Sequence, residues 1–110
     1  KGGEDMRERD IEKILTEEVK REGGRAYKWT SPGNAGVPDR IVIFPNRKPI
    51  FVELKTEGGS LSPLQVVQIM RLRDLGQAVE VVYGVAGLRA FFESYGYVRA
   101  ATRIAIKCKA

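Results

Sequence analysis

The chain contains no histidine, and this absence excludes several familiar kinds of active site. A Ser-His-Asp triad, a Cys-His pair and a zinc site built on imidazole all require a residue that this chain lacks. Its single cysteine, Cys108, can form neither an internal disulfide nor a cysteine metal cage. We therefore interpret Cys108 as an inert thiol near the C-terminal end, and we expect a reducing, cytoplasmic location.

Long apolar runs are also lacking. No stretch approaches the roughly twenty apolar residues needed to span a bilayer, and no signal-peptide pattern is visible. We therefore expect no membrane partner. Residues 1–5 precede Met6, and we expect Met6 to be a candidate natural start with an added remnant ahead of it.

What the chain does have is a basic charge on a small body. With 110 residues and a net charge of +5, we expect one domain over residues 1–110 and a polyanionic partner. A merely soluble basic protein would show the same charge, so the charge alone identifies no function.

The most informative stretch contains two short runs rich in β-branched and aromatic residues, Ile41–Phe44 and Ile50–Val52. A proline-flanked turn segment separates them, which predicts a β-hairpin. Asp39 lies at the entrance to the first strand, and Glu53 and Lys55 lie at the exit of the second. Because an antiparallel return brings these ends together, we expect Asp39 to lie next to Glu53 with Lys55 close by.

Two carboxylates and an amine at one end of a hairpin favour a metal site. Like charges at close range raise each other's pKa, and a divalent cation removes that conflict. Carboxylate oxygens suit Mg²⁺ or Mn²⁺, and the lysine could activate water or neutralise charge on phosphate oxygens. Taken alone, a Glu-x-Lys pair on one strand face is usually a solvated surface pair. Because the Gly-Val-Pro-Asp motif precedes this pair at hairpin distance, the sequence favours a metal-dependent phosphodiesterase site over a surface pair.

The first half of the chain predicts a helix over residues 5–22, in which Glu8 lies closer than Glu12 to the apolar stripe. A strand is expected over residues 25–30, with Tyr27 and Trp29 on one face. Its aromatic rings could stack on bases, although packing against the protein is the favoured role. Residues 31–37 form a turn-rich loop in which phosphate contact and simple turn chemistry are equally compatible with the sequence.

The second half predicts a helix over residues 62–75 that starts with a serine cap and a proline. Gln65 lies in its first turn, pointing back toward Glu53. A buried strand over residues 78–83 and a helix over residues 85–95 follow. The apolar residues expected to face inward from the 62–75 helix are Leu64, Val67, Met70, Leu72 and Leu75. The 97–110 tail could be an edge strand, an added helix, a dimer arm or a DNA arm.

Several motifs together resemble one family. Gly36-Val37-Pro38-Asp39-Arg40, Phe51-Val52-Glu53-Leu54-Lys55 and Leu61-Ser62-Pro63-Leu64-Gln65 occur in order, after Ser31-Pro32-Gly33. The pattern is similar to that of the VRR-NUC (virus-type replication-repair nuclease) branch of the PD-(D/E)XK superfamily, in its compact phage-type form. The resemblance covers about residues 6–92. It implies an α/β fold with a central mixed sheet flanked by helices in the order α-β-β-β-α-β-α.

The resemblance also implies an activity. It indicates a metal-dependent, structure-selective DNA endonuclease that acts on four-way junctions or flaps, resembling a Holliday-junction resolvase in DNA repair. Two-fold junctions favour a homodimer with two active sites. No organic cofactor is implied, and the expected setting is a bacterial or phage-infected cell.

The implied site residues follow the same motifs. Asp39, Glu53, the Leu54 main-chain carbonyl and a glutamate of the first helix, Glu8 or Glu12, are expected to bind Mg²⁺ or Mn²⁺. Asp39, Glu53, Lys55 and Gln65 are the expected catalytic group, with Gln65 hydrogen-bonding the lysine or a water. The residues expected to contact DNA are Lys28, Ser31, Gly33, Asn34, Arg40 and Arg71.

Two other functions remain compatible with this pattern. A non-catalytic nucleic-acid-binding module could share the fold, although it would have no use for intact Asp39, Glu53 and Lys55. A sequence-specific restriction enzyme would keep the chemistry, but the chain shows no obvious recognition insertion.

Overall fold

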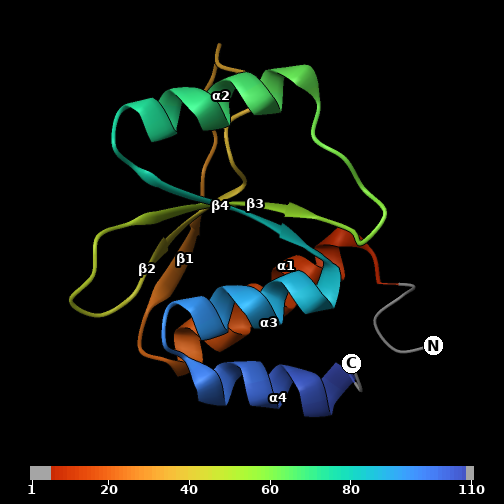
Figure 1. Cartoon of the computed structure of the whole chain (residues 1–110). Coiled ribbons are helices and arrows are strands. Elements are labelled where there is room, and N and C mark those ends of the chain that lie inside the picture. Colours follow the sequence, from red (N-terminus) through yellow and green to blue (C-terminus); the bar gives the residue numbers. More distant parts are fainter. Residues whose placement is uncertain (1–5, 109–110) are drawn as a thin grey trace.

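The computed structural model describes residues 6–108 and is built on one four-stranded sheet (Figure 1). The strand order is β1-β2-β3-β4. The strands are β1 (Arg25–Lys28), β2 (Arg40–Ile43), β3 (Ile50–Lys55) and β4 (Ala78–Tyr83). Both β1–β2 and β2–β3 are antiparallel, whereas β3 and β4 are parallel. The hairpin and the mixed sheet were both expected from the sequence, and both are confirmed.

Four helices cover this sheet unequally. One, α2 (Pro63–Asp74), connects β3 to β4 and lies on one face (Figure 1). The other three lie on the opposite side: α1 (Glu8–Arg21) and α3 (Gly84–Ser94) pack against the sheet, and α4 (Val98–Cys108) packs on α3 and α1. The predicted mixed α/β architecture is therefore confirmed, with one helix more at the C-terminal end. No helix in residues 6–108 is long and apolar enough to cross a membrane.

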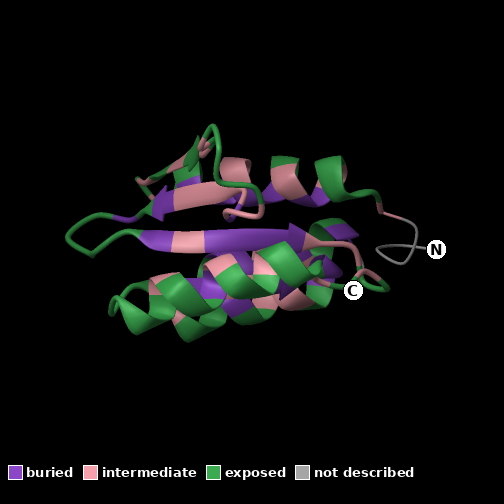
Figure 2. Ribbon diagram, turned by 90° about the horizontal axis from the view of Figure 1, so that it is seen from above, coloured by how far each residue is buried: buried purple, intermediate pink, exposed green. Residues whose placement is uncertain are grey.

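The hydrophobic core lies between the sheet and the three-helix face. Alternation along the strands points Val42, Val52 and Leu54 into this layer, where each is at most 1% exposed. Helix α1 contributes Ile11 and Leu15 at a spacing of four residues, both fully buried. Figure 2 shows the buried residues concentrated in the strands and on the inner sides of these helices.

The C-terminal tail forms an added helix and not an edge strand, two of the alternatives that the sequence left open. Helix α4 buries Ala100, Ile104 and Cys108, which recur every four residues and so lie on one face. The Arg103 guanidinium joins α4 to α1 through carboxylate oxygens of Glu18 at 2.8 Å and Glu22 at 2.7 Å. Burial raises the pKa of the Cys108 thiol, which agrees with an unreactive side chain.

The predicted inner face of α2 was wrong. Ile69 is the buried residue of this helix, whereas Leu64, Val67, Met70 and Leu75 are between 41% and 74% exposed. Apolar and polar residues are distributed all around the helix, so its sequence contains no single apolar stripe that could fix its rotation.

Candidate metal-dependent nuclease site

The β2–β3 register places Asp39 and Glu53 side by side. Arg40 pairs with Val52, so the next position outward sets Asp39 against Glu53. The Leu54 backbone N–H donates a hydrogen bond of 2.9 Å to Oδ2 of Asp39. This bond fixes an acid that lies outside the strand proper. The Leu54 carbonyl leaves β3 on the same side as its N–H, which is the side of β2.

Glu53 is the buried acid of the site, with 1% of its surface exposed. Its Oε2 accepts a 2.9 Å hydrogen bond from Nε2 of Gln65 and lies 3.8 Å from Nζ of Lys55. No hydrogen-bond donor in residues 6–108 reaches its Oε1. A buried carboxylate oxygen without a donor is costly, and such an atom is a natural ligand for a cation.

Burial and neighbouring charge make this carboxyl hold its proton unusually strongly. Loss of water around Glu53 is the main reason that its pKa rises to about 7, and the Asp39 carboxylate adds to the rise. The Lys55 ammonium opposes both effects. Near neutral pH, Glu53 is therefore poised between its protonated and charged forms, and a bound cation would favour the charged form.

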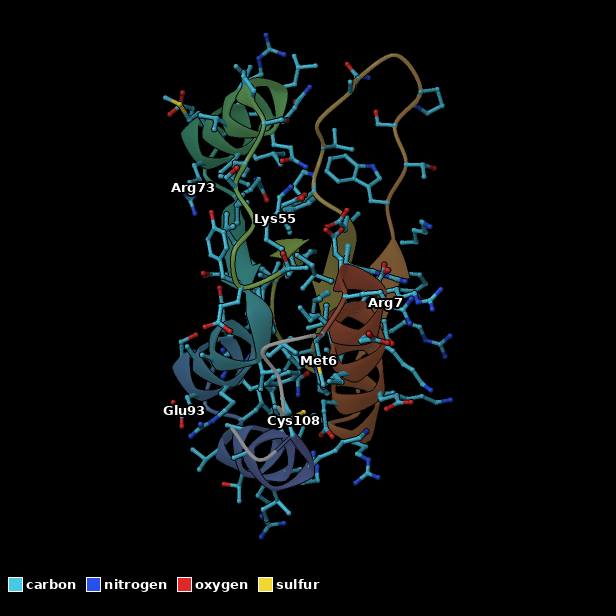
Figure 3. The ribbon with its side chains drawn as sticks, turned by 90° about the vertical axis from the view of Figure 1, so that its right-hand side faces the viewer. Met6, Arg7, Lys55, Arg73, Glu93 and Cys108 are labelled. Atoms are coloured by element: carbon cyan, nitrogen blue, oxygen red, sulfur yellow. The ribbon has the colours of Figure 1, made fainter. Side chains whose placement is uncertain are left out.

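Two acids of α1 were candidates for the same site, and the structure separates them. Glu8 feels the charges of Asp39 and Lys55, and its pKa is raised, first by burial and then by Asp39. Glu12 instead pairs with the Arg40 guanidinium at 2.7 Å. Figure 3 shows Lys55 at the level between α2 and the N-terminal end of α1. Glu8 is therefore the helix acid whose electrostatic environment is that of the site.

Gln65 connects the site to the start of α2. Its side-chain Oε1 accepts a 2.8 Å hydrogen bond from the Ser62 backbone N–H, and its backbone N–H donates a 3.2 Å hydrogen bond to Oγ of Ser62. This reciprocal cap orients the side-chain amide, so that its Nε2 points at Glu53. The expectation that Gln65 would lie near Glu53 is correct, but its partner is the carboxylate and not the lysine.

The residues expected to contact DNA do not share one environment. Lys28 and Arg71 are exposed, and Ser31, Gly33 and Asn34 occupy an exposed loop in which Nδ2 of Asn34 donates to Oγ of Ser31 at 3.0 Å. Arg40 differs from these residues, because Glu12 and the Ala26 carbonyl hold its guanidinium at 2.7 and 3.0 Å. We therefore leave Arg40 out of the proposed DNA contacts.

The donor set fits a hard divalent cation in its chemistry. Asp39, Glu53 and Glu8 carry carboxylate oxygens, and Leu54 has a main-chain carbonyl, which are the ligand types that such an ion prefers. Within residues 6–108, no three acidic or cysteine side chains form a ready-made metal cage. A cation held here would keep part of its coordination for water or phosphate, because Mg²⁺ commonly binds through only a few protein ligands.

Sequence reasoning missed two supports of the site. It considered only the carbonyl of Leu54 and not the amide that anchors Asp39. It also did not foresee that the Ser62 cap would orient Gln65. The Ser62-Pro63 pair followed by Gln65 three residues after the serine is a capping-box pattern, so the second support was readable from the sequence.

A mixed sheet with an acid, a Glu-x-Lys pair and a helix glutamine gathered at one strand end defines a PD-(D/E)XK-like nuclease domain. Comparison with known proteins supports this class. The sequence profile of the VRR-NUC domain matches residues 6–86. "Putative nuclease p44" of Acyrthosiphon pisum secondary endosymbiont phage 1 is 51% identical over 77 residues, which cover 70% of this chain and 83% of that protein.

A solved structure described as a VRR_NUC domain superposes with a TM-score of 0.75 at 31% sequence identity. The match covers 80% of this chain and 96% of the solved one. The chain therefore belongs to the VRR-NUC domain family and is a nuclease domain.

Proposed function

We propose that this nuclease is a divalent-metal-dependent endonuclease that hydrolyses phosphodiester bonds in branched DNA. The observation that carries the proposal is the buried Glu53 carboxylate beside Asp39: Gln65 holds one of its oxygens, and no donor among residues 6–108 reaches the other. Such an arrangement keeps an oxygen available for a cation at a position fixed by the fold.

Asp39, Glu53, Glu8 and the Leu54 carbonyl would hold Mg²⁺ or Mn²⁺. When bound, the ion supplies a Lewis acid for the phosphate and lowers the pKa of water. The remaining roles belong to the chain. The Leu54 amide and Gln65 hold the two central carboxylates in place.

Lys55 has the position of a residue that acts on the reacting groups. Its side chain is 15% exposed and its ammonium lies 3.8 Å from Oε2 of Glu53, so it is oriented but still open to a substrate. From this position it can orient the attacking water, or donate to a phosphate oxygen as negative charge builds there. The scissile phosphate would therefore lie against Lys55, at the carboxyl end of β3.

Cleavage of labelled four-way junction, flap and plain duplex DNA tests this proposal, with Mg²⁺, Mn²⁺ or EDTA in parallel. We expect branched substrates to be cut only when metal is present. Asp39→Ala, Glu53→Ala and Lys55→Ala should each lower the rate by about 10²-fold or more, the scale of a lost electrostatic contact in a transition state. Undiminished cutting in EDTA would contradict the metal proposal, and equal cutting of plain duplex would contradict branch selectivity.

We also propose that the enzyme acts as a homodimer, because a 110-residue chain offers little surface for selecting a junction alone. Sedimentation velocity across a concentration series tests this point. A chain that stays monomeric while it resolves junctions symmetrically would contradict it.

A further inference from the structure

The face of the sheet that carries the site is only partly covered. Asp39, Ile41 and Ile43 alternate onto this face, as do Glu53 and Phe51 on the next strand. Helix α2 packs here through Ile69, against the β4 side of the sheet. The β1–β2 side lies beyond this cover, and Ile43 is 38% exposed there.

Tyr27 lies on this uncovered part. It pairs with Ile41 in the β1–β2 ladder, so it shares the face of Asp39 and Glu53. Tyr27 belongs to the four-residue strand β1, and its side chain is 52% exposed. Trp29, two residues nearer the site, instead packs on Phe51 with ring centroids 5.2 Å apart. The two aromatic residues expected on one face therefore differ, because Trp29 packs on the protein and Tyr27 is presented to solvent.

Beyond Tyr27 the surface is hollowed and basic. A hollow of about 410 Å³ is lined by residues 23–25, Tyr27 and residues 43–47, which include Arg25 and Arg47 and no acid. The Arg25 guanidinium lies 5.9 Å from the centre of the Tyr27 ring. Arg47 is held in place by the Tyr95 carbonyl at 2.8 Å. An exposed ring with arginine side chains nearby is the chemistry that binds unpaired nucleotides, because every base has a face to stack and every phosphate a charge.

The distances along the strand connect this surface to the site. Tyr27 is opposite Ile41, two residues or about 7 Å from Asp39, and Ile43 is four residues or about 13 Å away. At about 3.4 Å per stacked nucleotide, this span corresponds to roughly two to four nucleotides. A strand that leaves the cleavage site along β1 and β2 would therefore reach Tyr27 first and the basic hollow next.

We propose that this face, from Tyr27 to the hollow at Arg25 and Arg47, binds an unpaired arm of the DNA substrate, with a base stacked on Tyr27. The inference rests on the proposed function and extends it by naming the part of the substrate that is recognised. An unpaired strand is favoured over a duplex because a stacked base pair presents no free ring face to Tyr27.

Arm length provides the test. Fluorescence anisotropy in EDTA measures binding, without cleavage, to two otherwise identical flap substrates whose unpaired arms are one and six nucleotides long. Wild-type protein should bind the six-nucleotide arm more tightly. Tyr27→Leu should remove that preference and weaken binding of the long arm by about 5- to 150-fold, the range measured for loss of one stacked base. Tyr27→Phe, which keeps the ring, should bind like the wild type.

Two further variants sharpen the result. Arg25→Gln should reduce the salt dependence of long-arm binding by about 0.7 in the slope of log K against log salt, as expected for one lost phosphate contact. Ile106→Ala removes a side chain that is 73% exposed on α4, and it should change neither binding nor arm preference. Thermal unfolding of each variant verifies that it is folded.

Three outcomes would overturn the inference: long-arm binding by Tyr27→Leu equal to wild type, equal losses on both arms, or equal losses in Tyr27→Leu and Tyr27→Phe. Each is distinct from failure of the proposed function, which is read separately as an absence of Mn²⁺-dependent cutting by the wild-type protein. Normal cutting with unchanged arm binding would leave the nuclease proposal standing and remove only the arm site.

Discussion

The two faces of the sheet differ in polarity and in how fully helices cover them. The face covered by α1, α3 and α4 is a closed apolar layer, in which Leu88 and Phe92 are fully buried. The other face carries the buried acid Glu53, one oxygen of which has no donor in the described part of the chain, and helix α2 covers this face in part. The first face stabilises the fold, whereas the buried charge of the second face lowers the stability of the fold in favour of the site. Substitutions on the first face should therefore change mainly stability, and those on the second mainly activity.

The largest effect on stability should come from the closed face. Leu88→Ala removes a fully buried side chain and leaves a cavity, so the free energy of unfolding should fall by about 2–5 kcal/mol. Urea denaturation measures this loss. Cutting per folded molecule should stay near the wild-type rate at low temperature. A stable Leu88→Ala with lost activity would break the division between the two faces.

Gln65→Ala should show the reverse pattern. It removes the hydrogen bond to Glu53 and half of the Ser62 cap, so metal affinity or cutting should fall by about 10- to 100-fold. Activity titrated against Mn²⁺ measures this change, and part of the loss should be recovered at high Mn²⁺. Gln68 lies on the same helix as Gln65, and Gln68→Ala is the matched control because it removes only a 3.3 Å contact to the Ala35 carbonyl. Similar losses in the two variants would mean that α2, and not Gln65, is responsible.

The destabilisation caused by the buried Glu53 carboxylate should depend on pH. The pKa of Glu53 is about 7 in the folded protein, above its ordinary value of 4.5, so the folded state binds more protons between these values. In EDTA, stability should therefore fall as pH rises from about 4.5 to 7 and then level off. Glu53→Gln should be about 1–3 kcal/mol more stable than wild type at pH 8, with the advantage lost below pH 4.5. Thermal unfolding across this range measures the effect, and a constant difference would contradict the burial argument.

The smallest effect is expected on the outer side of α2. Val66 and Met70 are 39% and 58% exposed, so replacing either by alanine should change the free energy of unfolding by less than about 0.5 kcal/mol. The sequence predicted that Met70 faces inward, whereas the structure has it exposed. Chemical denaturation of Met70→Ala distinguishes these two orientations. A loss above about 2 kcal/mol would favour the inward orientation.

These contrasts explain what the sequence could and could not predict. The hairpin was predictable because β-branched runs and a turn are local signals, and the pairing of Asp39 with Glu53 then follows from strand geometry. The rotation of α2 was not, because it depends on tertiary contacts, among them the burial of Ile69 and the Gln65–Glu53 hydrogen bond, in a helix with no single apolar stripe.

The remaining differences have the same origin. Glu8 and Glu12 lie four residues apart on one helix, and only the Arg40 partner shows which one is engaged elsewhere. The tail showed a weak alternation over residues 103–107, but the recurrence of Ala100, Ile104 and Cys108 every four residues was the stronger signal. Tertiary partners decided both cases. Metal binding and catalysis by the site residues stay predictions.

Calorimetric titration of Mn²⁺ into metal-free protein at pH 7.5 tests the central claim most directly, with Glu53→Gln as the comparison. Because Glu53 offers an oxygen that no donor within the described residues reaches, wild-type protein should bind the ion, and the variant should bind it at least about tenfold more weakly while remaining folded. Equal Mn²⁺ binding by the two proteins, or no binding by the wild type, would contradict the account.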